Sequence, residues 1–200
     1  MAKLPDRYME ERRQEILDAA RRVFVEKGYD AATINDIAAA ADVSAGSIYR
    51  YFENKRDLIA AAANACVDDD LELWSEDMPD DITAEGRADE CVLRLESYLA
   101  CYRDPELREH IAPKMEESTR ILEGFIRRAQ ESGELDPSID PERFARFLHV
   151  FGAGVGAHTV LYGPEFDTDS VWNQLISLVS TWFTGDLRSL VQQRMGETDQ

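Results

Sequence analysis

The chain has 200 residues and a formal charge of −18, with 44% hydrophobic and 31% charged residues. This composition is ordinary for a soluble globular protein, and the length fits one or two small domains rather than a large multidomain enzyme. No stretch approaches the roughly 18 apolar residues that would span a bilayer, and the polar N-terminus lacks the apolar core of a secretory signal. Three cysteines are too few for a disulfide framework, so we expect a cytoplasmic protein with no membrane partner.

The charge is unevenly distributed along the sequence. Residues 1–56 hold ten Lys or Arg and ten Asp or Glu, so they carry no net charge, whereas residues 57–200 carry the whole net charge of −18. A neutral segment attached to a strongly negative one suggests that the neutral segment meets a polyanion. The alternative is that the acidic surface only aids solubility.

Helices are predicted throughout, because no strand-like alternation is sustained and helix-forming residues dominate. The first helix is expected over residues 9–27, where an apolar stripe ends at Gly28, a natural C-terminal stop. Thr33 can cap a short second helix, and Ser44 can cap a third helix that ends near Phe52.

Six further helices are expected, separated by segments rich in Pro, Gly and Asp. Their approximate ranges are residues 55–74, 84–103, 106–111, 113–132, 141–162 and 169–191. The fold class is therefore expected to be all-α, with about nine helices in total.

Residues 33–55, TINDIAAAADVSAGSIYRYFENK, combine two short helices with a tight turn. The small side chains of Ala38 and Ala41 allow the two helices to cross closely, and apolar residues can hold them together. These are the requirements of a helix-turn-helix, in which the second helix projects its outer face into a DNA major groove.

The outer face of this second helix would carry the groups that read bases, while hydroxyl, phenol and ammonium groups suit phosphate oxygens. The groove-facing candidates are Ala45, Gly46, Ser47, Tyr49 and Arg50, with Ser44 at the start of the helix. The phosphate candidates are Thr33, Tyr49, Tyr51 and Lys55. In the alternative interpretation the two tyrosines pack at the surface and Lys55 is an ordinary solvated lysine.

Residues 12–59 resemble the DNA-binding domain of TetR-family transcriptional regulators. The resemblance rests on the pattern FVEKGYDAATI after the first helix, the paired short helices, the run IYRYF and the start NKRDL of the next helix. It implies that the phosphate and groove-facing candidates contact DNA. Ala45 stands where many family members carry a longer polar or basic side chain, and it can offer only a methyl contact.

The resemblance also implies the organisation and function of the whole chain. A helix-turn-helix DNA-binding domain would occupy residues 1–53, and a larger helical domain for effector binding and dimerisation would occupy residues 54–200. Such a protein is a ligand-responsive transcriptional regulator, most often a repressor. It binds a pseudo-palindromic operator in double-stranded DNA as a homodimer and is released by a small-molecule effector.

The last two expected helices are apolar around much of their circumference, so they need cover on more than one side. The resemblance implies that they pair with the same helices of a second subunit in a four-helix bundle; the alternative is that they cover only their own domain. The candidate dimerisation residues are Phe151, Val155, Leu175, Val179, Trp182 and Phe183.

A small-molecule pocket among the helices between residues 57 and 162 is likewise implied by the resemblance. The candidate ligand contacts are Trp74, Tyr98, Cys101, Tyr102, Met115, Phe125 and His149; the alternative is that each is a core residue. Neither a metal-binding spacing nor a phosphate loop or catalytic motif is found, so we expect no metal, no cofactor and no enzymatic activity. A helix-turn-helix that binds protein rather than DNA is the remaining alternative.

Overall fold

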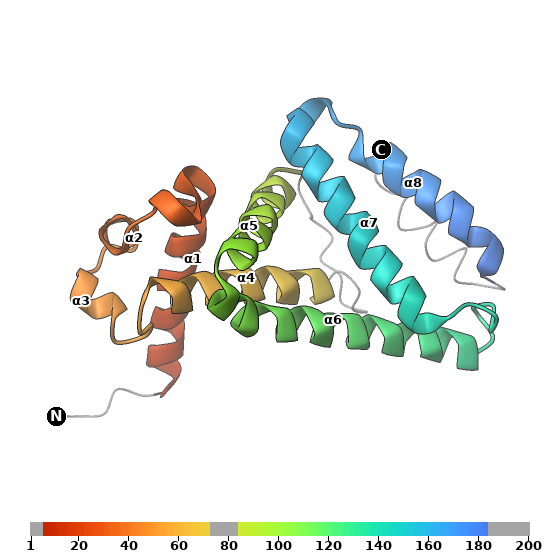
Figure 1. Cartoon of the computed structure of the whole chain (residues 1–200), viewed down its shortest axis with the longest axis horizontal. Helices are drawn as coiled ribbons and strands as arrows, with labels where there is room; N and C mark the ends of the chain where they lie inside the picture. Colours follow the sequence, from red (N-terminus) through yellow and green to blue (C-terminus); the bar gives the residue numbers. More distant parts are fainter. Residues whose placement is uncertain (1–5, 73–83, 184–200) are drawn as a thin grey trace. The chain divides into compact units, whose positions relative to one another are not determined.

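The computed structural model describes residues 6–72 and 84–183, and every regular element in these ranges is helical (Figure 1). The eight α-helices are α1 (Asp6–Ala31), α2 (Ile34–Ala40), α3 (Ala45–Ile48), α4 (Lys55–Glu72), α5 (Ala84–Arg103), α6 (Pro105–Glu131), α7 (Pro141–Tyr162) and α8 (Thr168–Val179). Two 3-10 turns, Gly163–Glu165 and Ser180–Trp182, complete the set. The all-α prediction is confirmed. None of the described helices is long and apolar enough to cross a membrane.

The chain divides into two compact units, residues 1–115 and residues 116–200. The division expected between residues 53 and 54 lies inside the first unit, because α1 packs not only on α2 but also on α4 and α5. The division into a DNA-binding and an effector-binding domain therefore stays a prediction about function.

The core of the first unit joins the short helices to α1. Side chains of Phe24, Ile37, Ile48, Phe52 and Leu58 are almost completely inaccessible to solvent and belong to one apolar cluster. Because α2 and α3 are too short to be stable alone, this shared core is what fixes their crossing. Figure 1 shows the two helices side by side next to α1.

The helix α6 replaces two expected helices. Residues 106–111 and 113–132 were predicted as separate elements, with Pro113 as the break, but Pro113 lies inside one continuous helix. Proline removes one helical hydrogen bond and leaves the carbonyl of Glu109 without its usual donor. Both residues are exposed, so water can satisfy that carbonyl and the helix continues. This merger accounts for eight described α-helices where about nine were predicted.

The last predicted helix, residues 169–191, is also wrong in its extent. The α-helix α8 ends at Val179, and Phe183 is extended and forms an isolated antiparallel bridge with Leu135. The N–H of Asp136 donates to the carbonyl of Trp182 at 2.8 Å. This pairing and the packing of Phe183 on the core of the second unit outweigh the helical pattern of the sequence. Residues 184–191 lie outside the described residues.

The second unit is built on α7, whose bounds agree with the prediction. Asp140 caps the helix by accepting a hydrogen bond from the N–H of Arg143 at 3.1 Å, and Pro141 occupies the first turn. The short Gly163–Glu165 connection returns the chain along α7, so α7 and α8 are antiparallel neighbours (Figure 1). The core of this unit consists of Leu122 and Ile126 from α6, Leu135, and Phe144 and Ala145 from α7, and Val179 of α8 packs against it.

Candidate functional site

The start of α2 is fixed by a reciprocal cap. The hydroxyl of Thr33 accepts a hydrogen bond from the N–H of Asp36 at 3.1 Å, and the Asp36 carboxylate accepts from the Thr33 N–H at 2.9 Å. Lys27 donates to the same carboxylate at 2.7 Å. The ammonium of Lys27 and the bonds from Thr33 lower the pKa of Asp36 to about 2. The Thr33 hydroxyl also donates to Asp36 at 2.7 Å, so Thr33 has a structural role before any DNA is present.

The start of α3 is capped in the same way by Ser44. Its Oγ accepts from the N–H of Ser47 at 3.1 Å and lies 2.8 Å from the Ser47 hydroxyl. Gly46 follows on the exposed surface, and a Cβ added there would come no closer than 3.9 Å to Ser44. Packing within the described residues therefore does not require glycine at this position, which leaves close approach by an external molecule as a reason for it.

The remaining candidates divide into outward-facing and inward-facing groups. Tyr49 is 55% exposed, Arg50 is exposed, and neither side chain has a polar partner among the described residues. Ala45 is partly buried against the core, as is Tyr51, whose hydroxyl lies 3.8 Å from the sulfur of Met9. The surface that α3 and the turn after it offer to a partner is thus formed by Gly46, Ser47, Tyr49 and Arg50.

Lys55 begins α4 and is half-buried. Its ammonium donates to the backbone carbonyl of Asp30, at the end of α1, at 3.0 Å. This partner could not be predicted from the sequence, because the two residues are far apart along the chain. An ammonium group has three donors, so this bond leaves two for another acceptor.

Arg13, a basic residue of α1, contacts the segment that follows α3. The guanidinium of Arg13 lies 4.9 Å from the centre of the Phe52 ring, in a cation–π contact on the buried end of the IYRYF run. This contact could not be predicted from the sequence, because it depends on the packing of the helix that carries Arg13 next to the segment that carries Phe52.

The effector candidates do not come together in one pocket. Tyr98 and Met115 line a small cavity between α4, α5 and α6 in the first unit, with Arg94 and Ser97 among the other wall residues. The cavity measures about 20 Å³, close to the space that one water molecule needs. An effector would have to enlarge it.

The other effector candidates have separate surroundings. Cys101 is partly buried, and burial raises the pKa of its thiol. Tyr102 is 87% exposed, Phe125 lies in the second unit under the guanidinium of Arg128, and Trp74 falls outside the described residues.

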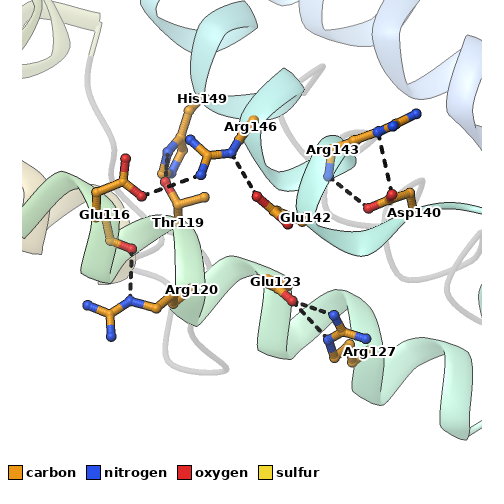
Figure 2. Close-up of polar contacts among 10 residues, drawn as sticks. All are labelled: Glu116, Thr119, Arg120, Glu123, Arg127, Asp140, Glu142, Arg143, Arg146 and His149. Atoms are coloured by element: carbon orange, nitrogen blue, oxygen red, sulfur yellow. Dashed lines mark hydrogen bonds and ion pairs between the residues drawn. The ribbon is translucent and has the colours of Figure 1, made fainter.

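His149 joins α7 to α6 in the second unit, as Figure 2 shows. Its Nδ1 is 3.0 Å from the hydroxyl of Thr119, and its Nε2 is 3.4 Å from that of Ser118. Both hydroxyl-bearing residues are buried. Nearby, Arg146 lies between Glu116 at 3.5 Å and Glu142 at 3.3 Å (Figure 2). These contacts give His149 a structural function whether or not it meets an effector.

Most of the candidate dimerisation side chains are buried or packed within the second unit. Val155 and Leu175 are buried, Val179 and Phe183 pack on the core, and the Phe151 ring packs edge-to-face on another ring at 5.2 Å. Among these candidates, only Trp182 is exposed.

A different set of apolar residues faces outward. Among the exposed apolar residues on α7 and α8 are Phe147, Val150, Leu161, Tyr162 and Leu178, of which Val150 is 73% and Leu178 62% exposed. These residues could not be singled out from the sequence, because a helix that is apolar on all sides does not reveal which side faces its own core. We call these five residues the outer apolar face.

Two short crossing helices that present a polar and basic outer surface define the chain as a helix-turn-helix DNA-binding protein. Residues 16–62 match the family model "Bacterial regulatory proteins, tetR family", and residues 101–175 match "Tetracyclin repressor-like, C-terminal domain". The chain belongs to the TetR family of DNA-binding transcriptional regulators, whose members are not enzymes.

Relatives of known description support this assignment along most of the chain. The fatty acid metabolism regulator protein of Bacillus subtilis (strain 168) is 27% identical over 82% of this chain and 92% of its own length. The transcriptional repressor KstR2 of Rhodococcus jostii (strain RHA1) is 27% identical over 84% of this chain and 89% of its own. A solved TetR-family regulator from Rhodococcus sp. superposes with a TM-score of 0.75 at 23% identity, covering 88% of this chain and all of that one.

Proposed function

We propose that the protein is a repressor that binds a pseudo-palindromic operator as a homodimer and is released by a small molecule. The observation that carries the proposal is the outward surface of α3 and of the turn that follows it, where Tyr49 and Arg50 have no polar side-chain partners among the described residues. Support also comes from relatives described as repressors. The neutral charge of residues 1–56 fits contact with a polyanion.

The DNA contacts are proposed in two classes. Arg50 and Ser47 would reach base edges, with Gly46 and Ala45 allowing close approach of α3 to the groove. Tyr49 and Lys55 would hold phosphates, since one is exposed and the other retains free donors. Thr33, Ser44 and Tyr51 would contribute through the caps and packing that fix the helices, and by further contacts to the DNA backbone.

The dimer is proposed to form through the outer apolar face. An exposed apolar surface of this kind on neighbouring helices is typical of an interaction site. Gly154 lies on the exposed side of α7 with open space at its Cβ position, so a partner helix can approach closely there. A dimer is needed because a pseudo-palindrome has two half-sites.

Effector release is proposed to operate through α4, which begins beside the DNA-binding helices and forms part of the small cavity. A ligand that enlarges the cavity would displace α4 and change the spacing of the two DNA-binding heads. Linkage requires DNA to weaken ligand binding by the same factor. A shift from 99:1 bound to 1:99 needs about 5.5 kcal/mol of differential affinity.

The experiment is a selection of duplexes from a random library, followed by titration of the selected duplex with protein. A two-fold symmetric product bound by two chains supports the proposal. A thermal-shift screen then seeks the effector, starting with long-chain acyl-CoA thioesters because a solved relative, FadR of Bacillus subtilis, was crystallised with stearoyl-CoA. A compound that binds tightly and leaves operator affinity unchanged would contradict release through α4.

A further inference from the structure

The end of α1 is held by α5. Gly28 leaves the helical conformation with a φ of 76°, a region that favours glycine, and the N–H of the next residue, Tyr29, donates to Oε2 of Glu96 at 3.0 Å. The Glu96 carboxylate lies 3.4 Å from the position that a Cβ of residue 28 would occupy. The kink at Gly28 near the end of α1 is therefore fitted to a side chain from α5.

The side chain of Tyr29 provides a second connection between α1 and α5. It is 2% exposed, and its hydroxyl lies 3.0 Å from the hydroxyl of Ser97, which in turn donates to the carbonyl of Leu93 at 2.7 Å. Burial raises the pKa of Tyr29, so its hydroxyl remains a donor. The Tyr29 ring packs edge-to-face on Phe24 in the core of the first unit, at 4.8 Å. We call Tyr29, Glu96 and Ser97 the α1–α5 clamp.

The clamp lies close to both functional regions. Thr33, which caps α2, follows Tyr29 closely along the chain, and the Lys27 bond to Asp36 ties the two sides of the turn together. Ser97 also belongs to the wall of the small cavity. A displacement of α5 at the cavity would thus be transmitted to the start of α2 through these hydrogen bonds and the short backbone segment between Tyr29 and Thr33.

We propose that Glu96 and Ser97 are positioning residues for DNA binding, which act through Tyr29 and couple α5, in addition to α4, to the DNA-binding helices. The inference rests on the proposed function. Neither residue belongs to the helix-turn-helix, and a carboxylate at Glu96 would itself repel phosphate. Any loss of DNA affinity on its removal therefore has the opposite sign to the direct electrostatic effect.

The test compares three variants of the full-length chain on the duplex that the wild type selects from a random library. Glu96→Ala should weaken binding about tenfold, the scale of one lost hydrogen bond to a charged group, with no change in the salt dependence. Glu96→Gln should bind within about twofold of the wild type, because the amide oxygen still accepts the Tyr29 N–H. Asp89→Ala removes a carboxylate from an exposed position on the same helix and should bind as well as the wild type or better.

Amide hydrogen exchange provides the second measurement. The Tyr29 amide should be protected in the wild type and in Glu96→Gln, and should exchange faster in Glu96→Ala. Tyr29→Phe serves as a milder variant if Glu96→Ala does not fold, and it should weaken DNA binding about threefold, in line with one neutral hydrogen bond.

Two outcomes overturn the inference in different ways. If the Tyr29 amide loses protection in Glu96→Ala while the affinity matches that of Asp89→Ala, the clamp does not position the DNA-binding helices, and the proposed function stands. If the wild type enriches no duplex at all, the proposed function fails and the inference fails with it.

Discussion

Side chains in the DNA-binding region fall into two groups, those with an intramolecular partner and those without one among the described residues. Thr33, Tyr51 and Lys55 each have an intramolecular partner, whereas Tyr49 and Arg50 have none among the described residues. The sequence predicted Thr33, Tyr51 and Lys55 as phosphate contacts, Arg50 as groove-facing and Tyr49 in both classes. It could not show which of them have intramolecular partners, since partners such as Met9 and Asp30 lie on α1.

Replacing Lys55 tests its proposed contact with phosphate. Lys55→Ala should weaken binding to all sequences and reduce the slope of log affinity against log salt by about one. Arg103→Ala is the matched control, because Arg103 also contacts Asp30, through the carboxylate at 2.9 Å. If the two variants change affinity and salt slope equally, Lys55 acts only by supporting the end of α1.

Arg50 should instead determine sequence preference. Arg50→Ala is expected to change the discrimination among bases at one position of each half-site by about 1–3 kcal/mol, the contribution of a bidentate contact with guanine. Titration of a set of single-base variants of the selected duplex measures this directly. A uniform loss of affinity across the set would assign Arg50 to a phosphate.

The cap of α2 predicts a response to acid. The pKa of Asp36 is lowered from 3.8 to about 2 in the folded chain, so its stabilising effect is fully present above the unfolded pKa and is lost as the pH falls through about 2. Asp36→Asn should therefore flatten the decline of unfolding free energy between about pH 4 and pH 2. Identical acid profiles of the variant and the wild type in urea unfolding would refute this role.

At the scale of elements, the sequence predicted helices where a cap and an apolar stripe agree. Thr33 at the start of α2 and Ser44 at the start of α3 are examples. The failures have specific tertiary causes. Pro113 lies on an exposed face that tolerates it inside α6, and Phe183 leaves the helical path to pair with Leu135. Neither the exposure of Pro113 nor the pairing of Phe183 with Leu135 can be recognised from the local sequence.

The same limit applies to the dimerisation candidates. Val155 and Leu175 were chosen because α7 and α8 are apolar, yet both side chains are buried within the second unit. The proposed interface therefore moves to the outer apolar face, which contains none of the residues chosen from sequence. A substitution at Phe183 would damage the core and could not report on dimerisation.

A single aspartate in the outer apolar face should dissociate the dimer. Leu178→Asp removes an apolar contact of about 1.5–3 kcal/mol from each subunit, which raises the dimer dissociation constant at least about 100-fold. Leu99→Asp makes the same change at an exposed position on α5 and should leave the dimer intact. Sedimentation at several concentrations decides the question, and a Leu178→Asp dimer as tight as the wild type would place the interface elsewhere.

At the scale of the whole molecule, the charge distribution sets the conditions for DNA binding. Residues 1–56 are neutral, and residues 57–200 carry a net charge of −18. The acidic part repels DNA at a distance, so contact has to be confined to the DNA-binding helices, and the local phosphate contacts make binding weaken as salt rises. The family, the all-α fold class and the DNA-contacting helix α3 could be predicted from the sequence. The effector could not be predicted, because its candidate contacts have separate surroundings and the cavity that two of them line has room for little more than one water.

The central claim is that a dimer of this chain reads two half-sites with α3. It is tested most directly by selecting duplexes from a random library and measuring the stoichiometry and footprint of the selected complex. We predict a two-fold symmetric sequence bound by two chains, with half-site centres separated by about 34–36 Å, one turn of the duplex, or a multiple of it. Altering the base read by Arg50 in both half-sites should weaken binding of the wild type and should have little effect on Arg50→Ala. Enrichment of an asymmetric sequence bound by one chain, or binding that survives removal of the polar side chains of α3, would contradict the account.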